Sequence, residues 1–92
     1  MNFDLYYPHN IKYFDPIPLI NIKFVNNEQE VVHIYYIQNK KKIGKLATVL
    51  PPLSTREYQF PKNSSIGIFL IKDLKNPYRI VKLINGNIYI IP

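Results

Sequence analysis

The chain has 92 residues, which is enough for one domain and too few for two. Apolar residues make up 47% of it and aromatic residues 14%, a composition that is typical of a globular protein and excludes an intrinsically disordered one. The absence of cysteine excludes disulfides and thiolate metal sites. With no signal peptide and no membrane-length apolar stretch, we expect a protein of the cytoplasm, with the nucleus as the alternative.

Residues 1–18 form the first segment of the chain. Pro8, Pro16 and Pro18 exclude a long helix or strand there, so we predict an extended N-terminal arm. The arm is rich in aromatic residues, and we expect some of them to pack across the domain or against a partner. Residues 19–92 then make up the domain itself.

Apolar and β-branched runs recur from residue 19 onward, with turn residues between them. The run 19–26 places Ile20, Ile22 and Phe24 on one side, the period-two pattern of a half-buried strand. The predicted strands are 19–26, 31–38, 45–50, 56–60, 66–72, 78–84 and 87–91. Short strands spaced roughly 8–12 residues apart are typical of a sandwich or barrel, and we predict a seven-stranded antiparallel β-sandwich.

Turn chemistry indicates where these strands end. Proline lacks the ladder donor, so Pro51 and Pro61 each end a strand. Asn85 and Gly86 form the strongest hairpin signal in the chain, because both residues tolerate positive φ, and they predict that strands 78–84 and 87–91 pair as a β-hairpin.

Residues that carry chemistry are sparse. A metal site needs three or four convergent ligands, and the chain offers only His9 and His33 besides dispersed carboxylates. No nucleophile motif, P-loop or dinucleotide fingerprint is present. We therefore expect no enzyme, no metal and no cofactor, with His33 in a structural or groove-lining role.

Four lysines form the densest charge cluster: Lys40, Lys41, Lys42 and Lys45, in a chain of net charge +6. The cluster is a candidate patch for an anionic partner such as nucleic acid. Solubility and protection of a sheet edge explain it equally simply, and we favour that reading. Aromatic residues near basic ones can also stack bases, and the candidates are Tyr35, Tyr36, Tyr58 and Tyr78.

Several segments taken in order resemble the β domain of the von Hippel-Lindau family. They are FVNN, EVVHIYYIQN, LPP, IFLIKD and NGNIYIIP, and the match covers roughly residues 19–92. The resemblance implies a seven-stranded β-sandwich that binds an extended peptide along a sheet edge and takes up a trans-4-hydroxyproline in an aromatic pocket. In that family, the pocket consists of two tryptophans, a tyrosine, a serine and a histidine.

The resemblance assigns the pocket position by position. Tyr36 and Phe69 fall on the two tryptophans, and we expect the ligand ring to lie between them. The family's tyrosine falls near Ala47 or Thr48, its histidine falls on Gly67, and Ser64 or Ser65 takes the place of its serine. The predicted ligand-binding residues are Tyr36, Thr48, Tyr58, Ser64, Ser65 and Phe69.

The leading functional hypothesis is a non-enzymatic module that binds a protein segment containing proline or hydroxyproline. The family's elongin C-docking domain would begin where this chain ends, so we expect no elongin C partner and no membrane partner. The alternatives are a basic β module that binds nucleic acid, and a structural subunit that assembles through an edge strand or the N-terminal arm.

Overall fold

The computed structural model describes residues 17–39 and 42–92, so most of the predicted N-terminal arm lies outside the described residues. The described chain forms seven strands: β1 (Leu19–Asn26), β2 (Val32–Ile37), β3 (Ile43–Leu50), β4 (Ser54–Pro61), β5 (Ser65–Leu70), β6 (Arg79–Lys82) and β7 (Ile88–Ile91). They make a three-stranded sheet in the order β4-β1-β7 and a four-stranded sheet in the order β3-β2-β5-β6. The predicted all-β fold with seven strands is confirmed.

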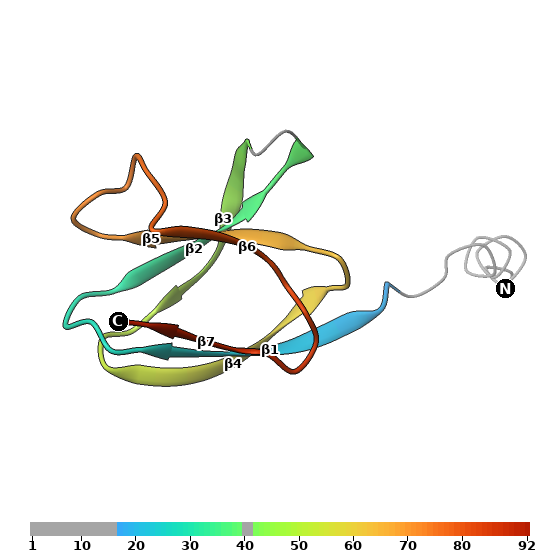
Figure 1. Cartoon of the computed structure of the whole chain (residues 1–92), viewed down its shortest axis with the longest axis horizontal. Coiled ribbons are helices and arrows are strands. Elements are labelled where there is room, and N and C mark those ends of the chain that lie inside the picture. The colour runs from blue at the N-terminus through green and yellow to red at the C-terminus, as the bar shows by residue number, and fades with distance from the viewer. Residues whose placement is uncertain (1–16, 40–41) are drawn as a thin grey trace, which may run out of the picture.

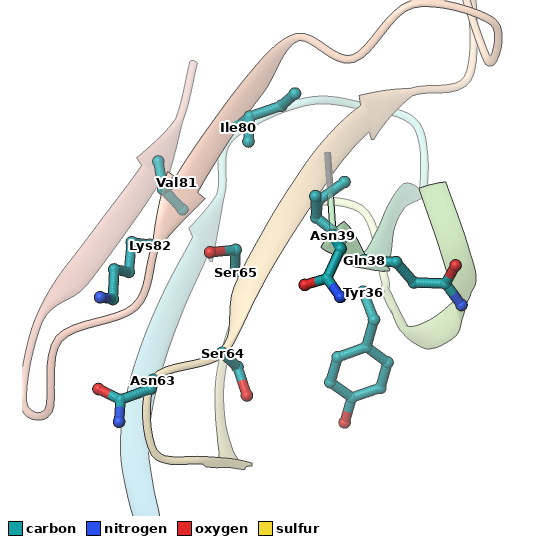
Figure 2. A pocket seen from close by; sticks show the side chains of 10 residues that line it. Tyr36, Gln38, Asn39, Asn63, Ser64, Ser65, Ile80, Val81 and Lys82 are labelled. Atoms are coloured by element: carbon teal, nitrogen blue, oxygen red, sulfur yellow. The ribbon is translucent and has the colours of Figure 1, made fainter. Parts of the chain in front are cut away.

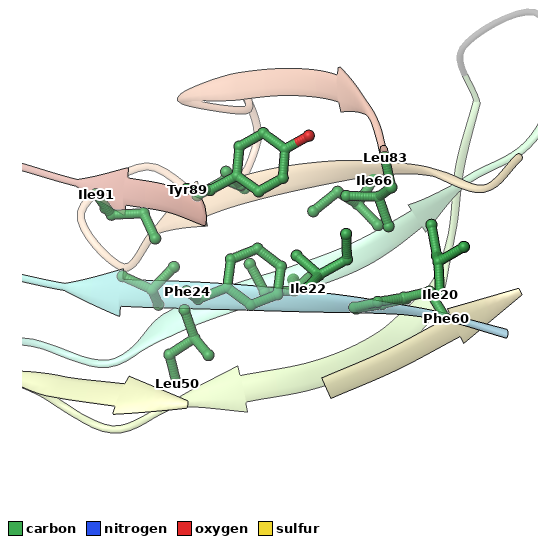
Figure 3. Packing of buried hydrophobic residues seen from close by; sticks show 12 residues of the cluster. Ile20, Ile22, Phe24, Leu50, Phe60, Ile66, Leu83, Tyr89 and Ile91 are labelled. Atoms are coloured by element: carbon green, nitrogen blue, oxygen red, sulfur yellow. The ribbon is translucent and has the colours of Figure 1, made fainter. Parts of the chain in front are cut away.

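The two sheets form two layers with the core between them (Figure 1). One cluster of buried side chains draws on both sheets, and Figure 3 shows its packing. Its members are Ile20, Ile22, Phe24, Val32, Ile34, Leu50, Phe60, Ile66, Ile68, Leu83, Tyr89 and Ile91. Burial of this apolar area is the main term that stabilises the fold.

Phe24 lies at the centre of the core. Its side chain is fully buried, and its ring centroid lies 6.2 Å from that of Tyr58, 6.1 Å from that of Phe60 and 6.0 Å from that of Tyr89. These separations fall within the range of favourable aromatic pairs. Tyr58 and Phe60 come from β4 and Tyr89 comes from β7. The Phe24 ring therefore packs against both strands that flank β1 in its sheet.

Asn26 is the one buried polar residue of the described chain, and it joins the end of β1 to two loops. Its Nδ2 donates hydrogen bonds to the carbonyl oxygens of Glu30, at 3.1 Å, and Pro51, at 2.9 Å. Its Oδ1 accepts one from the backbone N–H of Glu28 at 2.8 Å. A buried amide with both ends bonded is stabilising, whereas the same groups left unpaired are costly.

Asn85 and Gly86 do not close a hairpin, so that prediction is wrong. β6 pairs with β5 in the four-stranded sheet, whereas β7 crosses to the other sheet and runs parallel to β1. Gly86 does adopt a positive φ of 85°, but the turn binds β1: its N–H donates to the Asn21 carbonyl and Asn85 Oδ1 accepts from the Asn21 N–H. The β1–β7 pair also makes the fold not wholly antiparallel.

Asp73 organises the loop between β5 and β6. Its carboxylate accepts hydrogen bonds from the backbone N–H groups of Lys75 and Asn76 and from the Asn76 side chain. These bonds, the backbone bond from Asn76 first, hold the pKa of Asp73 below its ordinary value.

A lowered pKa predicts a definite pH dependence for this loop. The carboxylate stabilises the fold above the unfolded-state pKa, and that contribution is lost as the pH falls through the lower folded-state pKa. We expect Asp73→Ala to be slightly less stable than the parent chain at pH 7 and equally stable once the parent carboxyl is protonated. Thermal unfolding of both proteins from pH 7 to pH 2 measures this, and a constant difference across the range would contradict it.

The described part of the chain contains no helix that combines the length and apolarity needed to cross a bilayer.

Candidate functional site

A pocket of about 580 Å³ opens where β2, β5 and β6 meet at one end of the four-stranded sheet (Figure 2). The strands stop at different points there. β5 begins at Ser65, opposite Lys82 of β6, whereas its pairing with β2 ends at Tyr36 and the chain after β2 continues past it. The lining residues are Tyr36, Ile37, Gln38, Asn39, Asn63, Ser64, Ser65, Ile80, Val81 and Lys82. The pocket thus combines an aromatic and an aliphatic wall with several amide and hydroxyl groups.

The turn between β4 and β5 places the serines at this pocket. Asn63 adopts a left-handed φ of 69°, which asparagine tolerates better than most residues, and the Ser64 N–H bonds back to the Pro61 carbonyl at 3.2 Å. The Ser64 hydroxyl also donates to the Pro61 carbonyl, so it does not offer its proton to a ligand. The Ser65 hydroxyl makes no hydrogen bond to another described residue, which leaves it available to a ligand.

Tyr36 and Phe69 lie on opposite faces of the four-stranded sheet, so the expectation that they enclose one ligand ring is wrong. Tyr36 stands opposite Ile66, a core residue, and its ring meets Phe60 between the sheets at 5.9 Å. Phe69 lies three positions beyond Ile66 along β5, and an odd step along a strand reverses the face. Its ring packs edge-on against Tyr35 at 5.2 Å.

Phe69 is buried although it lies outside the core between the sheets. Its ring leans over Gly67, where a Cβ would come within 2.9 Å of the ring and 3.1 Å of the Ile37 side chain. Gly67 therefore leaves room for the Phe69 ring, a role in packing that differs from the histidine position that the resemblance implies. Tyr35, Ile37 and Phe69 together form a small apolar cluster on the outer face.

The remaining predicted ligand residues lie away from the pocket. Thr48 stands opposite Ile34 in β3, and Tyr58 packs against Phe24 and the core. The pocket brings together Tyr36, Ser64 and Ser65, three of the six predicted ligand residues.

The basic cluster is described only in part. Lys42 and Lys45 are exposed where β3 begins, at an edge of the sheet, whereas Lys40 and Lys41 lie outside the described residues. Of the four tyrosines considered for base stacking, Tyr36 and Tyr58 pack against the core and do not offer a free ring face on the surface. Two of the four candidate residues for base stacking are therefore lost.

Sequence reasoning missed the far wall of the pocket, formed by Ile80, Val81 and Lys82 of β6, and Asn63 in the turn. Asn63 follows Pro61 and Lys62 in a recognisable turn, which was a usable signal. No signal in the sequence brings β6 beside the end of β2, because that contact depends on the order of the strands in the sheet.

Residues 17–39 and 42–92 contain no group of three or more His, Asp or Glu side chains that could hold a metal ion. His33 lies on the outer face of β2, with its ring 6.2 Å from that of Tyr35. The pocket itself offers amide and hydroxyl groups for hydrogen bonds, from Gln38, Asn39, Asn63, Ser64 and Ser65.

No protein-family model matches the chain, and no curated protein matches it.

Proposed function

We propose that the protein is a non-enzymatic module that binds an extended peptide segment, with a proline or hydroxyproline ring seated in the pocket at the ends of β2, β5 and β6. The observation that carries the proposal is the meeting of Tyr36, Ser64 and Ser65 in that pocket, since the resemblance to the von Hippel-Lindau β domain selected these residues in advance. The ring packs on Ile80, which shares the outer face of the sheet with Ser65, and Ser65 faces its hydroxyl. Tyr36 borders the pocket from the side of the core.

The free side of β6 supports a strand-addition mode of binding. β6 pairs with β5 alone among the described residues, and three of its four residues line the pocket. A peptide on this edge gains main-chain hydrogen bonds and places one side chain into the pocket. The β3 edge is less suitable, because its pairing with β2 is irregular and it carries lysines.

Discrimination between hydroxyproline and proline is expected to be weak. A single hydrogen bond from Ser65 contributes about 0.5–1.5 kcal/mol, which is a factor of about 2 to 10 in affinity. Strong rejection of proline requires buried polar groups that the wrong ligand leaves unpaired, and Ser65 is only half-buried.

Isothermal titration calorimetry with a matched pair of peptides tests the proposal. The two peptides share an alternating apolar sequence and differ only in a central proline or trans-4-hydroxyproline. Binding of both, with the hydroxylated peptide favoured by the factor given above, is the expected result. Failure of both to bind at millimolar concentration would rule the proposal out.

Ser65→Leu fills the floor of the pocket with a larger apolar side chain. We expect peptide affinity to fall at least about ten-fold, or 1.4 kcal/mol, because the ring can no longer enter. Thr55→Leu is the matched control, since Thr55 is an exposed polar strand residue of the other sheet. Equal losses in both variants would contradict the assignment of the pocket.

A further inference from the structure

The outer face of the four-stranded sheet carries several exposed apolar side chains beside the polar residues His33, Ser65 and Lys82. We define the apolar face by six residues that the register places on this side: Tyr35, Ile37, Leu46, Val49, Phe69 and Ile80. Leu46, Val49 and Ile80 are 44%, 37% and 41% exposed. A sheet with one solvated face normally alternates apolar and polar residues, so a cluster of apolar side chains on the outer face marks a candidate surface for another segment to cover.

The outer face of the three-stranded sheet shows the contrast. Two polar pairs cross its centre: Lys23 lies 3.7 Å from Glu57 in an ion pair, and Gln59 donates a hydrogen bond to Asn21. Such pairs are typical of a face in water. The exposed large apolar residues of this face are Leu19 at the start of β1 and Ile88 and Ile90 on the edge strand β7.

Pro18, where the chain leads into β1, lies near one end of the apolar face. The Lys62 N–H donates to the Pro18 carbonyl at 2.8 Å, and the next residue, Asn63, lines the pocket together with Ile37 and Ile80 of the apolar face. Residues 1–16 therefore connect to the domain at the end of the sheet where the apolar face begins.

The length and composition of residues 1–16 match this surface. Fully extended, they span about 50 Å, whereas an eight-residue strand such as β3 spans about 26 Å. They contain eight large apolar residues: Met1, Phe3, Leu5, Tyr6, Tyr7, Ile11, Tyr13 and Phe14. Asp4 and Asp15 outnumber Lys12, whereas the rest of the chain is strongly basic, so the charges are complementary.

We propose that residues 1–16 of the chain bind the apolar face of their own molecule, with their aromatic side chains covering Leu46, Phe69 and Ile80. This inference goes beyond peptide binding in the pocket, and Ile80 is a residue that the two proposed binding surfaces share. It assigns the aromatic residues of the N-terminal segment a partner within the chain.

A paramagnetic label on the full chain tests the proposal directly. The absence of cysteine means that Asn10→Cys provides a single attachment point for a nitroxide. In the ¹⁵N-labelled protein, we expect selective loss of amide signal from Leu46, Phe69 and Ile80, and none from Thr55, Ile88 or Ile90. Equal losses on both sheets, or no losses, would overturn the proposal.

Two further samples separate binding within one molecule from binding between molecules and from accidental contact. In a mixture of nitroxide-labelled ¹⁴N protein with unlabelled ¹⁵N protein, signal loss would show that a second copy supplies the segment and would overturn the intramolecular form. The double variant Leu46→Glu, Ile80→Glu should abolish the loss within one molecule, whereas Ile88→Glu should preserve it. Persistence of the loss in the double variant would also overturn the proposal.

Discussion

Phe24→Ala is expected to lower the free energy of unfolding by about 3–5 kcal/mol, the range for removing a buried phenylalanine ring. The ring is fully buried and contacts Tyr58, Phe60 and Tyr89, so its loss leaves a cavity bordered by all three strands of its sheet. The total free energy of unfolding of a domain of this size is about 5–14 kcal/mol. The variant is therefore expected to approach the limit of stable folding.

Urea unfolding followed by circular dichroism measures this loss. Leu19→Ala is the matched control, because Leu19 belongs to the same strand but is 55% exposed. We expect the control to cost less than about 1 kcal/mol, as is usual for surface positions. Similar losses in the two variants would show that the core is not centred on Phe24.

Asn26→Asp is expected to lower the free energy of unfolding by about 3–5 kcal/mol at neutral pH, although the side chain keeps its size. The carboxylate still accepts from the Glu28 N–H, but it cannot donate to the carbonyl groups of Glu30 and Pro51. A buried charge then faces two unpaired carbonyl oxygens, which is among the most destabilising arrangements in a protein interior.

The same substitution at an exposed position is the control for Asn26. Asn21 lies on β1 in solvent, and its Oδ1 accepts from Gln59, a bond that aspartate preserves. We expect Asn21→Asp to change stability by less than about 0.5 kcal/mol. If Asn26→Asp were equally mild in chemical denaturation, Asn26 would not be the link between β1 and the loops that we describe.

The regular parts of the fold were predictable because their determinants are local. The strand predicted at 19–26 matches β1 from end to end, since Ile20, Ile22 and Phe24 alternate with polar residues. The proline residues Pro51 and Pro61 end β3 and β4 within one residue of their predicted ends.

The predictions were wrong where the structure depends on pairing between strands that are far apart in the sequence. Asn85-Gly86 makes a turn, but the turn does not determine which strand comes next to β6, and hydrogen bonds to Asn21 of β1 draw β7 into the other sheet. Whether Tyr36 and Phe69 share a face depends on the register between β2 and β5, which a single sequence does not reveal.

Only part of the pocket could be predicted, because some of its residues come together only through the order of the strands in the sheet. Ser64 and Ser65 follow a turn and could be chosen from the sequence together with Tyr36, whereas Ile80 and Lys82 reach the pocket only through the position of β6 in the sheet. The proposed peptide site thus rests on three residues chosen in advance and on a strand edge that only the structure reveals.

In the proposed function, the pocket and the edge of β6 receive an extended, proline-containing segment. Titration of the ¹⁵N-labelled full chain with the hydroxyproline peptide, followed by amide chemical shifts, tests it most directly. We expect saturable shifts at Ser65, Gly67, Ile80 and Lys82, with β4 and the outer face of β1 unchanged. Shifts confined to the three-stranded sheet, or none at millimolar peptide, would contradict it.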